Sequence, residues 1–394
     1  MKAVAVLRRW TAPWWQGDAG RGSARAGDSA RGVDKWLLAA TLALTGTGLL
    51  MIYSITAATA AGRPTAHLES QGLKVLIGIV AFAIGYRIDY HRYSRVAPIL
   101  YLVGVAALVL VFVPGLGHEV NGARRWIRLG RQTFQPADFA RLAFIVYLAF
   151  LLAKPEARLR NFRTGLAPCL VALAVMVAPV LKQPNLSTAM AFVMIAGIML
   201  VAGGIPLKHF LWVAAPGVLA APFVVHPYQI GRLRNFLLFW KDGAGYLEGN
   251  YQLNQSIIAI GSGGFLGQGL GESRQKWSFL PDAHTDFIFA ILGEELGFLG
   301  AVTVVVLLGI IMWRAYEAAR RAPDRFGSLL AAGLGISVAL YAGVNTAVAT
   351  GMFPTTGLPL PLFSYGGTAV LVTLFSLGIL ANIATQGDAP RGRK

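Results

Sequence analysis

The stretch Asp286-Phe-Ile-Phe-Ala-Ile-Leu-Gly-Glu-Glu-Leu-Gly-Phe-Leu-Gly-Ala-Val-Thr-Val-Val-Val-Leu-Leu-Gly-Ile-Ile-Met312 decides the class of fold. A bilayer core of about 30 Å requires roughly 20 mostly apolar residues in an α-helix, and this stretch exceeds that length. It also contains Glu294 and Glu295, although carboxylates are costly inside a membrane. The stretch therefore predicts a membrane-spanning helix whose acidic groups serve a paired network or a function.

Similar apolar runs occur on both sides of this one. They lie near residues 35–58, 72–86, 97–113, 138–153, 164–181, 187–204, 209–225, 327–350 and 367–385. The composition agrees, since 55% of the 394 residues are hydrophobic and only 13% are charged. We predict an all-α polytopic membrane protein with about ten transmembrane helices. A soluble enzyme, a disordered chain and a disulfide scaffold are excluded, the last because Cys169 is the single cysteine.

The net charge of +17 could suggest a nucleic-acid-binding protein. In a multispanning protein, however, excess Lys and Arg marks the loops on the cytoplasmic side. Basic residues occur in the amino-terminal segment and in alternate loops, which places both termini in the cytoplasm and one long extracytoplasmic loop between spans seven and eight. We predict a disordered basic cytoplasmic tail (1–34), a transmembrane domain (35–385) and a second basic cytoplasmic tail (386–394), with no nucleic-acid partner.

Two groups of basic residues lie on the predicted outer side, against the usual charge bias. The first lies between spans three and four and the second in the long loop: Arg124, Arg125, Arg128 and Arg131, then Arg232, Arg234, Lys241, Arg274 and Lys276. Guanidinium groups bind phosphate oxygens through two parallel hydrogen bonds. These residues therefore indicate either phosphate recognition or loops that rest on lipid headgroups.

The long loop contains two recognisable segments. Residues 251–261, which include Gln255, have the pattern of an amphipathic helix that ends at glycine. Residues 263–271 are rich in glycine, which gives the backbone freedom and allows a close approach to a ligand. No strand precedes them and no Gly-Lys-Ser/Thr follows, so they match no nucleotide-binding fingerprint.

Asp286 stands where the eighth span begins. It could cap the helix, because Asp accepts hydrogen bonds from the first free amides. It could instead be a general base, provided that the exclusion of water raises its pKa. Glu294 and Glu295 lie roughly 12 Å further along the helix. Arg141 in span four could pair with a glutamate or face a substrate groove.

The last polar segment runs from Asn345 to Ala369. Its prolines Pro354, Pro359 and Pro361 cannot continue a helix, so irregular backbone is expected at the membrane boundary. Such backbone is tolerated only where protein or a wet cavity surrounds it. Ser364 is not in a nucleophile elbow, since no Gly-x-Ser-x-Gly is present.

These segments resemble the SEDS family (shape, elongation, division and sporulation), which includes FtsW, RodA and SpoVE. The resemblance covers about residues 34–383. It rests on Asn345 to Ala369, on Asn121-Gly-Ala-Arg-Arg-Trp126, on Gln135-Pro and on His284-Thr-Asp-Phe-Ile-Phe289. Residues 269–276 and 280–284 are more similar to FtsW than to RodA.

The resemblance implies a peptidoglycan glycosyltransferase that polymerises lipid II during cell division, with its active site outside the cytoplasmic membrane. It implies that Asp286 is the catalytic base. The expected substrate-binding residues are Arg124, Arg125, Arg141, Lys276, Gln255, His284 and Ser364, and the expected structural or network residues are Glu294, Glu295, Asn185 and Pro354. The chain departs from the family pattern at four positions: Asp138 (usually Glu), Arg141 (usually Lys), Asn185 (usually Asp) and Ser187 (usually Gly).

The expected reaction inverts the anomeric carbon. Asp286 would take the proton of an acceptor hydroxyl, and undecaprenyl diphosphate would leave, so that a β-1,4 bond forms. A divalent cation (Mg²⁺ or Mn²⁺) could stabilise the leaving diphosphate, and no cofactor is otherwise identified. The resemblance further implies a class B penicillin-binding protein (an FtsI-like transpeptidase) and divisome proteins as partners, at the division septum of the inner membrane. A lipid II flippase, a RodA-like elongation polymerase and a non-catalytic scaffold remain alternatives.

Overall fold

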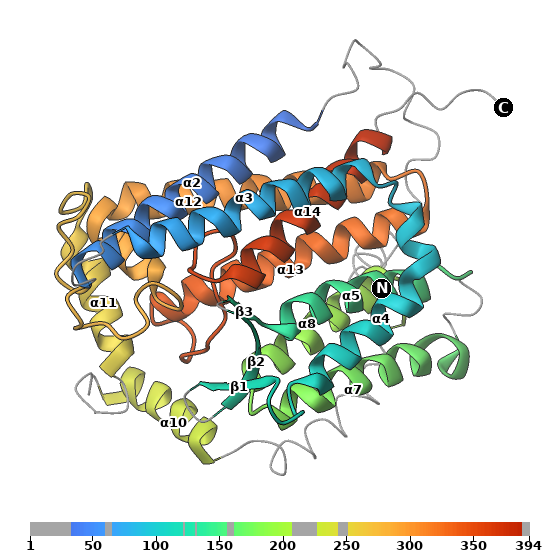
Figure 1. Cartoon of the computed structure of the whole chain (residues 1–394), viewed down its shortest axis with the longest axis horizontal. Coiled ribbons are helices and arrows are strands. Elements are labelled where there is room, and N and C mark those ends of the chain that lie inside the picture. The colour runs from blue at the N-terminus through green and yellow to red at the C-terminus, as the bar shows by residue number, and fades with distance from the viewer. Residues whose placement is uncertain are drawn as a thin grey trace, which may run out of the picture.

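The computed structural model describes residues 33–59, 65–120, 123–130, 132–155, 161–206, 227–242 and 251–387. Helices dominate them (Figure 1). They are α2 (Lys35–Thr59), α3 (Ala66–Arg87), α4 (His91–Leu110), α5 (Pro136–Leu152), η1 (Phe162–Leu166), α7 (Ala167–Lys182), α8 (Leu186–Ala202), α10 (Pro227–Asp242), α11 (Tyr251–Gly263), α12 (Ile288–Arg321), α13 (Arg325–Ala349) and α14 (Gly367–Gly387). Three strands complete them: β1 (Gly117–Val120), β2 (Ala123–Leu129) and β3 (Gln132–Phe134).

The prediction of a polytopic all-α membrane protein is confirmed. Within the described ranges, seven helices are long and apolar enough to cross a membrane, and α8 is a shorter apolar helix. α5 has only 17 residues and is buried along most of its length, as expected of a helix enclosed by others. The predicted span at 209–225 lies outside the described residues, so the count of ten spans stays a prediction.

The long helices form two groups in Figure 1, α2, α3, α12, α13 and α14 in one and α4, α5, α7 and α8 in the other. α3 packs closely along α14, and glycines make this possible. A Cβ at Gly85 would lie 2.7 Å from the carbonyl oxygen of Phe375, and one at Gly378 would lie 2.2 Å from that of Phe82. Small residues allow helix backbones to approach in this way in membranes, where packing drives association.

A small antiparallel sheet, which the sequence did not predict, connects α4 to α5. In β2, the neighbouring residues Arg124 and Arg125 point to opposite faces of the sheet, because successive side chains of a strand alternate in direction. Arg124 is exposed, and its Nε donates to Glu119 Oε2 over 3.1 Å. Arg125 is half-buried and points to the other face. The sheet therefore directs the side chain of Arg125, and not that of Arg124, toward the interior of the protein.

Helix α12 is broken at Gly297, whose φ of 66° and ψ of −164° are not helical. The glycine-rich segment packs against this break. Gly267 has a φ of 86° and lies so close to α12 that a Cβ there would be 2.2 Å from the carbonyl oxygen of Glu295. Four backbone bonds join the two segments: Gln268 N to Glu294 O (3.0 Å), Gly269 N to Glu295 O (3.0 Å), Phe298 N to Gly264 O (2.9 Å) and Leu299 N to Phe265 O (3.3 Å). These bonds satisfy groups that the break removes from the helix. The predicted close approach thus occurs, but it is to α12 and not to a ligand.

We expect Gly297→Ala to destabilise the protein. An L-residue at this φ and ψ costs about 1–3 kcal/mol, and a Cβ would lie 2.3 Å from the backbone nitrogen of Gly267. Gly309→Ala on the same helix is the matched control, since a Cβ there meets nothing within 4 Å. Thermal unfolding of the purified protein in detergent should show a lower midpoint for Gly297→Ala alone. Equal midpoints for the two variants would contradict this account of the break.

The end of the predicted amino-terminal tail belongs to the folded part. The side chain of Asp34 is only 6% exposed and forms an ion pair with Arg314 of α12. Its Oδ1 also accepts from the backbone nitrogens of Trp36 and Leu37, over 3.1 and 3.2 Å, at the start of α2. Asp34, the last residue of the predicted tail, thus contacts α12 and the start of α2.

Candidate active site at the start of helix α12

Asp286 lies in the loop immediately before α12. The N-cap residue of this helix is Phe287, which contributes no side-chain cap, so the capping role considered for Asp286 is not observed. Main-chain bonds fix the position of Asp286 instead: its nitrogen donates to Asp282 O (3.0 Å), and its carbonyl oxygen accepts from Asn345 Nδ2 (2.8 Å). Among the described residues, no hydrogen bond to its carboxylate is found, which leaves that group available for a substrate.

The loop between α13 and α14 fastens the Asp286 loop in place. Ser364 Oγ donates to Thr285 O (2.5 Å) and accepts from Leu360 N (2.9 Å), while Tyr365 N donates to His284 O (2.9 Å). Ser364 is 2% exposed, and its hydroxyl is already occupied by these two bonds. The structure therefore places Ser364, predicted to bind substrate, where it holds two loops together.

Two arginines act on the carboxyl group of Asp286. Arg125 Nε donates to Gln183 O (3.1 Å) and Nη2 to Pro184 O (2.5 Å), and Arg232 Nη1 of α10 donates to Thr355 O (3.1 Å). Both cations lower the pKa of Asp286, but burial, helped by the charge of Asp282, outweighs them and raises this pKa to about 7. Asp286 remains partly accessible to solvent. The site thus combines a carboxyl that titrates near neutrality with two guanidinium groups.

Arg232 was not among the predicted site residues. It belongs to a group of five basic residues in the long loop, and their charge alone did not distinguish them. Its place is set by the bond to Thr355, beside the prolines of the α13–α14 loop. Pro354 is half-buried in that loop, next to the acceptor residue. Arg232 could have been found only by predicting that α10 contacts the α13–α14 loop, more than 100 residues away in the sequence.

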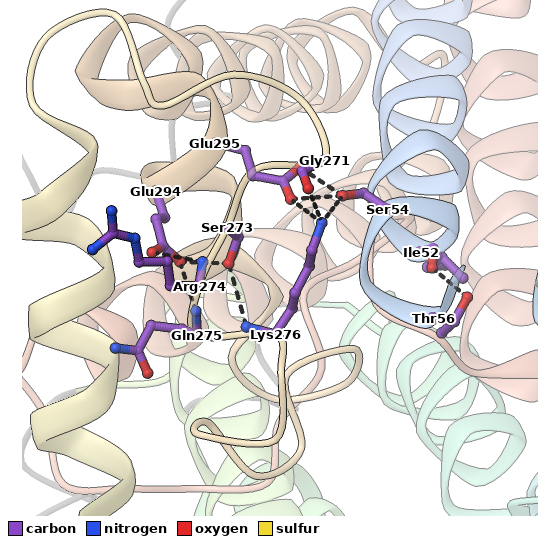
Figure 2. Close-up of polar contacts among 10 residues, drawn as sticks. All are labelled: Ile52, Ser54, Thr56, Gly271, Ser273, Arg274, Gln275, Lys276, Glu294 and Glu295. Atoms are coloured by element: carbon purple, nitrogen blue, oxygen red, sulfur yellow. Dashed lines mark hydrogen bonds and ion pairs between the residues drawn. The ribbon is translucent and has the colours of Figure 1, made fainter. Parts of the chain in front are cut away.

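Glu294 anchors the segment that leads to Asp286. It is 1% exposed, and its carboxylate accepts hydrogen bonds from Ser273 Oγ (2.5 Å), Arg274 N (3.1 Å) and Gln275 N (3.3 Å). Figure 2 shows these donors converging on one carboxylate. A buried carboxylate is tolerated when such donors replace water.

Glu295 forms the second half of this network (Figure 2). Its carboxylate is buried and accepts from Ser54 Oγ of α2 (2.6 and 2.8 Å) and from Lys276 Nζ (3.3 Å). Lys276 also donates to Gly271 O and is only 5% exposed. Its ammonium group is enclosed by these partners and is not open to a diphosphate. The structure therefore supports a different role for Lys276 from the predicted one, namely holding the loop onto α12 and α2.

The remaining predicted residues lie in several places. Arg141 stacks over the ring of Tyr341 (3.9 Å to the centroid) and lies 3.7 Å from Asp138, so it pairs with neither glutamate. It lines a cavity of about 20 Å³, which has room for a water molecule but not for a lipid. Gln255 is half-buried on α11, which begins at the predicted residue 251 and ends two residues beyond the predicted end, at Gly263. Arg124 is at the surface of the sheet.

Asn185 and His284 lie at loop ends near the site. Asn185 is the N-cap of α8, and its Oδ1 accepts from Thr188 N over 3.3 Å. This is a role that asparagine fills as well as aspartate. Burial and the nearby His67 lower the pKa of His284, which keeps the ring neutral near pH 7. No cluster of three His, Cys, Asp or Glu side chains suited to a metal occurs in the described ranges, and the divalent cation stays a prediction.

Comparison with known proteins decides the family. The model of the cell cycle protein family FtsW/RodA/SpoVE matches residues 35–388. The chain belongs to the FtsW/RodA/SpoVE family. A probable peptidoglycan glycosyltransferase FtsW of Trichlorobacter lovleyi is 41% identical over 359 residues, which cover 89% of this chain and 93% of the relative. Stage V sporulation protein E of Bacillus subtilis is 35% identical over 89% of this chain and 96% of its own length.

Solved structures of the FtsW/RodA/SpoVE type agree. A chain of a peptidoglycan synthase complex that coordinates polymerization and crosslinking has a TM-score of 0.73 at 26% identity, covering 89% of this chain and 97% of that chain. The rod shape determining protein RodA of Thermus thermophilus has a TM-score of 0.66 at 27% identity, with 89% and 96% covered. The predicted family is confirmed, as is the greater similarity to FtsW, whose relatives reach 41% identity.

Proposed function

We propose that this protein is a peptidoglycan glycosyltransferase that polymerises lipid II with inversion at the anomeric carbon. The observation that supports this most directly is the carboxyl of Asp286, which is held in a fastened loop, serves no helix cap and lies in the field of two arginines. FtsW relatives named as peptidoglycan glycosyltransferases, at about 40% identity over most of the chain, support the substrate class.

In the proposed reaction, Asp286 accepts the proton of the acceptor 4-hydroxyl while that oxygen attacks the donor anomeric carbon. The bond from this carbon to the diphosphate oxygen breaks, and undecaprenyl diphosphate leaves with the bonding electrons. A base is most effective when its pKa lies near the working pH, and a pKa of about 7 satisfies this condition. In this proposal, Arg125 and Arg232 stabilise the charge that gathers on the leaving group, and their effect on the carboxyl of Asp286 supports this role.

The location and partners follow from the same proposal. Lipid II is polymerised outside the cytoplasmic membrane, so the Asp286 end of α12 would face outward, as the basic loops predict. One structural relative is a chain of a complex that couples polymerization to crosslinking. This supports a transpeptidase of the class B penicillin-binding type as partner, and the FtsW similarity favours the division septum.

The decisive experiment is to incubate the purified chain in detergent with lipid II, alone and with its transpeptidase partner, and to separate the products by size. We expect glycan polymer. Detergent removes the second compartment, so a flippase would give no product in this assay. Absence of polymer under both conditions, from protein that is folded by thermal unfolding, would favour a flippase or a scaffold and contradict the proposal.

A further inference from the structure

Helix α3 has a stripe of polar residues in its first half, beside the exposed Glu69 of its first turn. Ser70 and Gln71 lie three and four residues after His67, and Lys74 lies four and three residues after them, so the four residues share one face of the helix. The neighbouring residues Leu73, Leu76, Ile77 and Val80 are exposed and apolar, as expected for contact with lipid chains. A cation two turns inside a membrane helix is costly unless it has a partner or a function.

The stripe faces the loop that fastens Asp286. Lys74 Nζ lies 4.4 Å from the ring centroid of Tyr365 and 3.4 Å from its hydroxyl, and Ser70 Oγ lies 3.5 Å from the same hydroxyl. The ring of Tyr365 is 5.4 Å from that of His67 and 5.6 Å from that of His284. No carboxylate of the described ranges forms an ion pair with Lys74, so this half-buried cation has only neutral partners.

We propose that Lys74, together with His67, Ser70 and Tyr365, binds the diphosphate of the acceptor lipid II. This inference rests on the proposed function. An ammonium group beside the Tyr365 hydroxyl, with Ser70 and His67 against the same tyrosine, suits phosphate oxygens, because hydrogen bonds between ionised partners are the strong ones. The exposed apolar side chains of α3 lie directly beside the stripe and offer a surface for the polyprenyl chain of the same molecule.

The assignment to the acceptor follows from the chemistry of the two substrates. In the donor, the reacting carbon itself carries the diphosphate, so the donor diphosphate must lie close to the base. In the acceptor, the reacting hydroxyl is on the outer sugar, and its diphosphate is attached to the other sugar of the disaccharide. Arg232 is bound to Thr355 O, two residues before Gly357, where a Cβ would lie 3.5 Å from Asp286 Oδ2, whereas Lys74 lies against Tyr365 at the other end of the same loop. The arginines therefore suit the donor and Lys74 the acceptor.

A binding experiment tests the site without turnover. Full-length Asp286→Asn protein is titrated with lipid II, and the number of bound molecules is counted by native mass spectrometry. We expect two, and we expect Lys74→Met to weaken the second by at least about tenfold, while Lys74→Arg keeps it. Lys182→Met is the matched control. Lys182, at the end of α7, also lies over an aromatic ring, that of Phe112, at 5.3 Å from its centroid. Two molecules bound equally well by Lys74→Met would overturn the proposal.

A kinetic experiment separates acceptor from donor. The donor is a lipid-linked tetrasaccharide whose terminal 4-hydroxyl is capped, and lipid II is varied as acceptor. Lys74→Met should raise KM for lipid II at least about tenfold with little change in kcat or in KM for the capped donor. A raised KM for the donor instead would overturn the assignment. Lys74-dependent binding of inorganic pyrophosphate as tight as that of lipid II would assign the site to free diphosphate and also overturn it.

The two proposals can fail separately. A protein that binds two lipid II molecules through Lys74 but forms no polymer would contradict the proposed function and leave the binding site standing. A protein that forms polymer, and whose Lys74→Met variant binds and reacts normally, would contradict the site alone.

Discussion

Asp286→Asn is expected to reduce glycan polymerisation at least about 100-fold, because a general base contributes roughly 10²–10⁴ in rate. Asparagine has nearly the same shape and cannot accept the proton of the attacking hydroxyl. The main-chain bonds that hold residue 286, to Asp282 and Asn345, do not involve the side chain and should persist. Initial rates with purified protein and lipid II measure the effect, and an unchanged unfolding midpoint shows that the fold is intact. Full activity of this variant would refute the assignment of the base.

Asp282→Asn provides the control and a pH test. Asp282 has a φ of 55°, a conformation that asparagine adopts readily, so the loop should be preserved. A base acts only when it is deprotonated. With a pKa of about 7 for Asp286, the wild-type rate should therefore rise between about pH 6 and pH 8. The charge of Asp282 raises this pKa, so its removal should move the rise to lower pH while the plateau rate stays similar. A rise that does not move would mean that another group titrates.

Lys276→Met is expected to lower the free energy of unfolding by about 3–5 kcal/mol, the usual cost of leaving one partner of a buried ion pair without its counter-charge. The carboxylate of Glu295 is 0% exposed and, among the described residues, would keep only Ser54 as a side-chain donor. The loss should appear as a lower midpoint of thermal unfolding in detergent. Polymerisation should fall with it, since the loop that leads to Asp286 would lose an anchor.

The double variant Lys276→Met, Glu295→Met is the control for this prediction. Replacing both members of a buried pair by apolar groups of similar volume is often neutral. Stability of the double variant should therefore exceed that of Lys276→Met alone, which gives a favourable coupling between the two positions. If Lys276→Met were as stable as wild type but inactive, Lys276 would contact substrate, as the sequence first suggested, and the network interpretation would be wrong.

The sequence predicted the transmembrane architecture because the bilayer imposes a simple requirement of length and apolarity on each helix. The apolar runs near 35–58, 72–86 and 327–350 correspond to α2, α3 and α13. Asp286 was singled out by the resemblance to the family, because its position at the start of an apolar helix is compatible with either a cap or a base. What remained open there, a cap or a base, depended on which residue the first helical turn uses as its N-cap.

The remainder depended on contacts between distant segments, which composition and periodicity do not encode. The alternation along β2 makes Arg125 and not Arg124 point inward, but the sheet itself was not predicted. Lys276 had the charge of a phosphate ligand, and only the position of Glu295 shows that this charge is already neutralised. The glycine-rich segment had the freedom to approach a ligand, yet a break in α12 lies opposite it.

The break at Gly297 also has a mechanical consequence. In a continuous helix, rotation about the axis is transmitted from one turn to the next by the backbone hydrogen bonds. Here the carbonyls of Glu294 and Glu295 are engaged by residues 268 and 269 and not by the next helical turn. We expect the part of α12 after Gly297 to rotate or tilt with its surroundings. The part before Gly297 should stay bound to the glycine-rich segment, and the orientation of Asp286 should stay fixed with it. Asp286, the proposed base, would thereby be insulated from torsion in the apolar long part of α12.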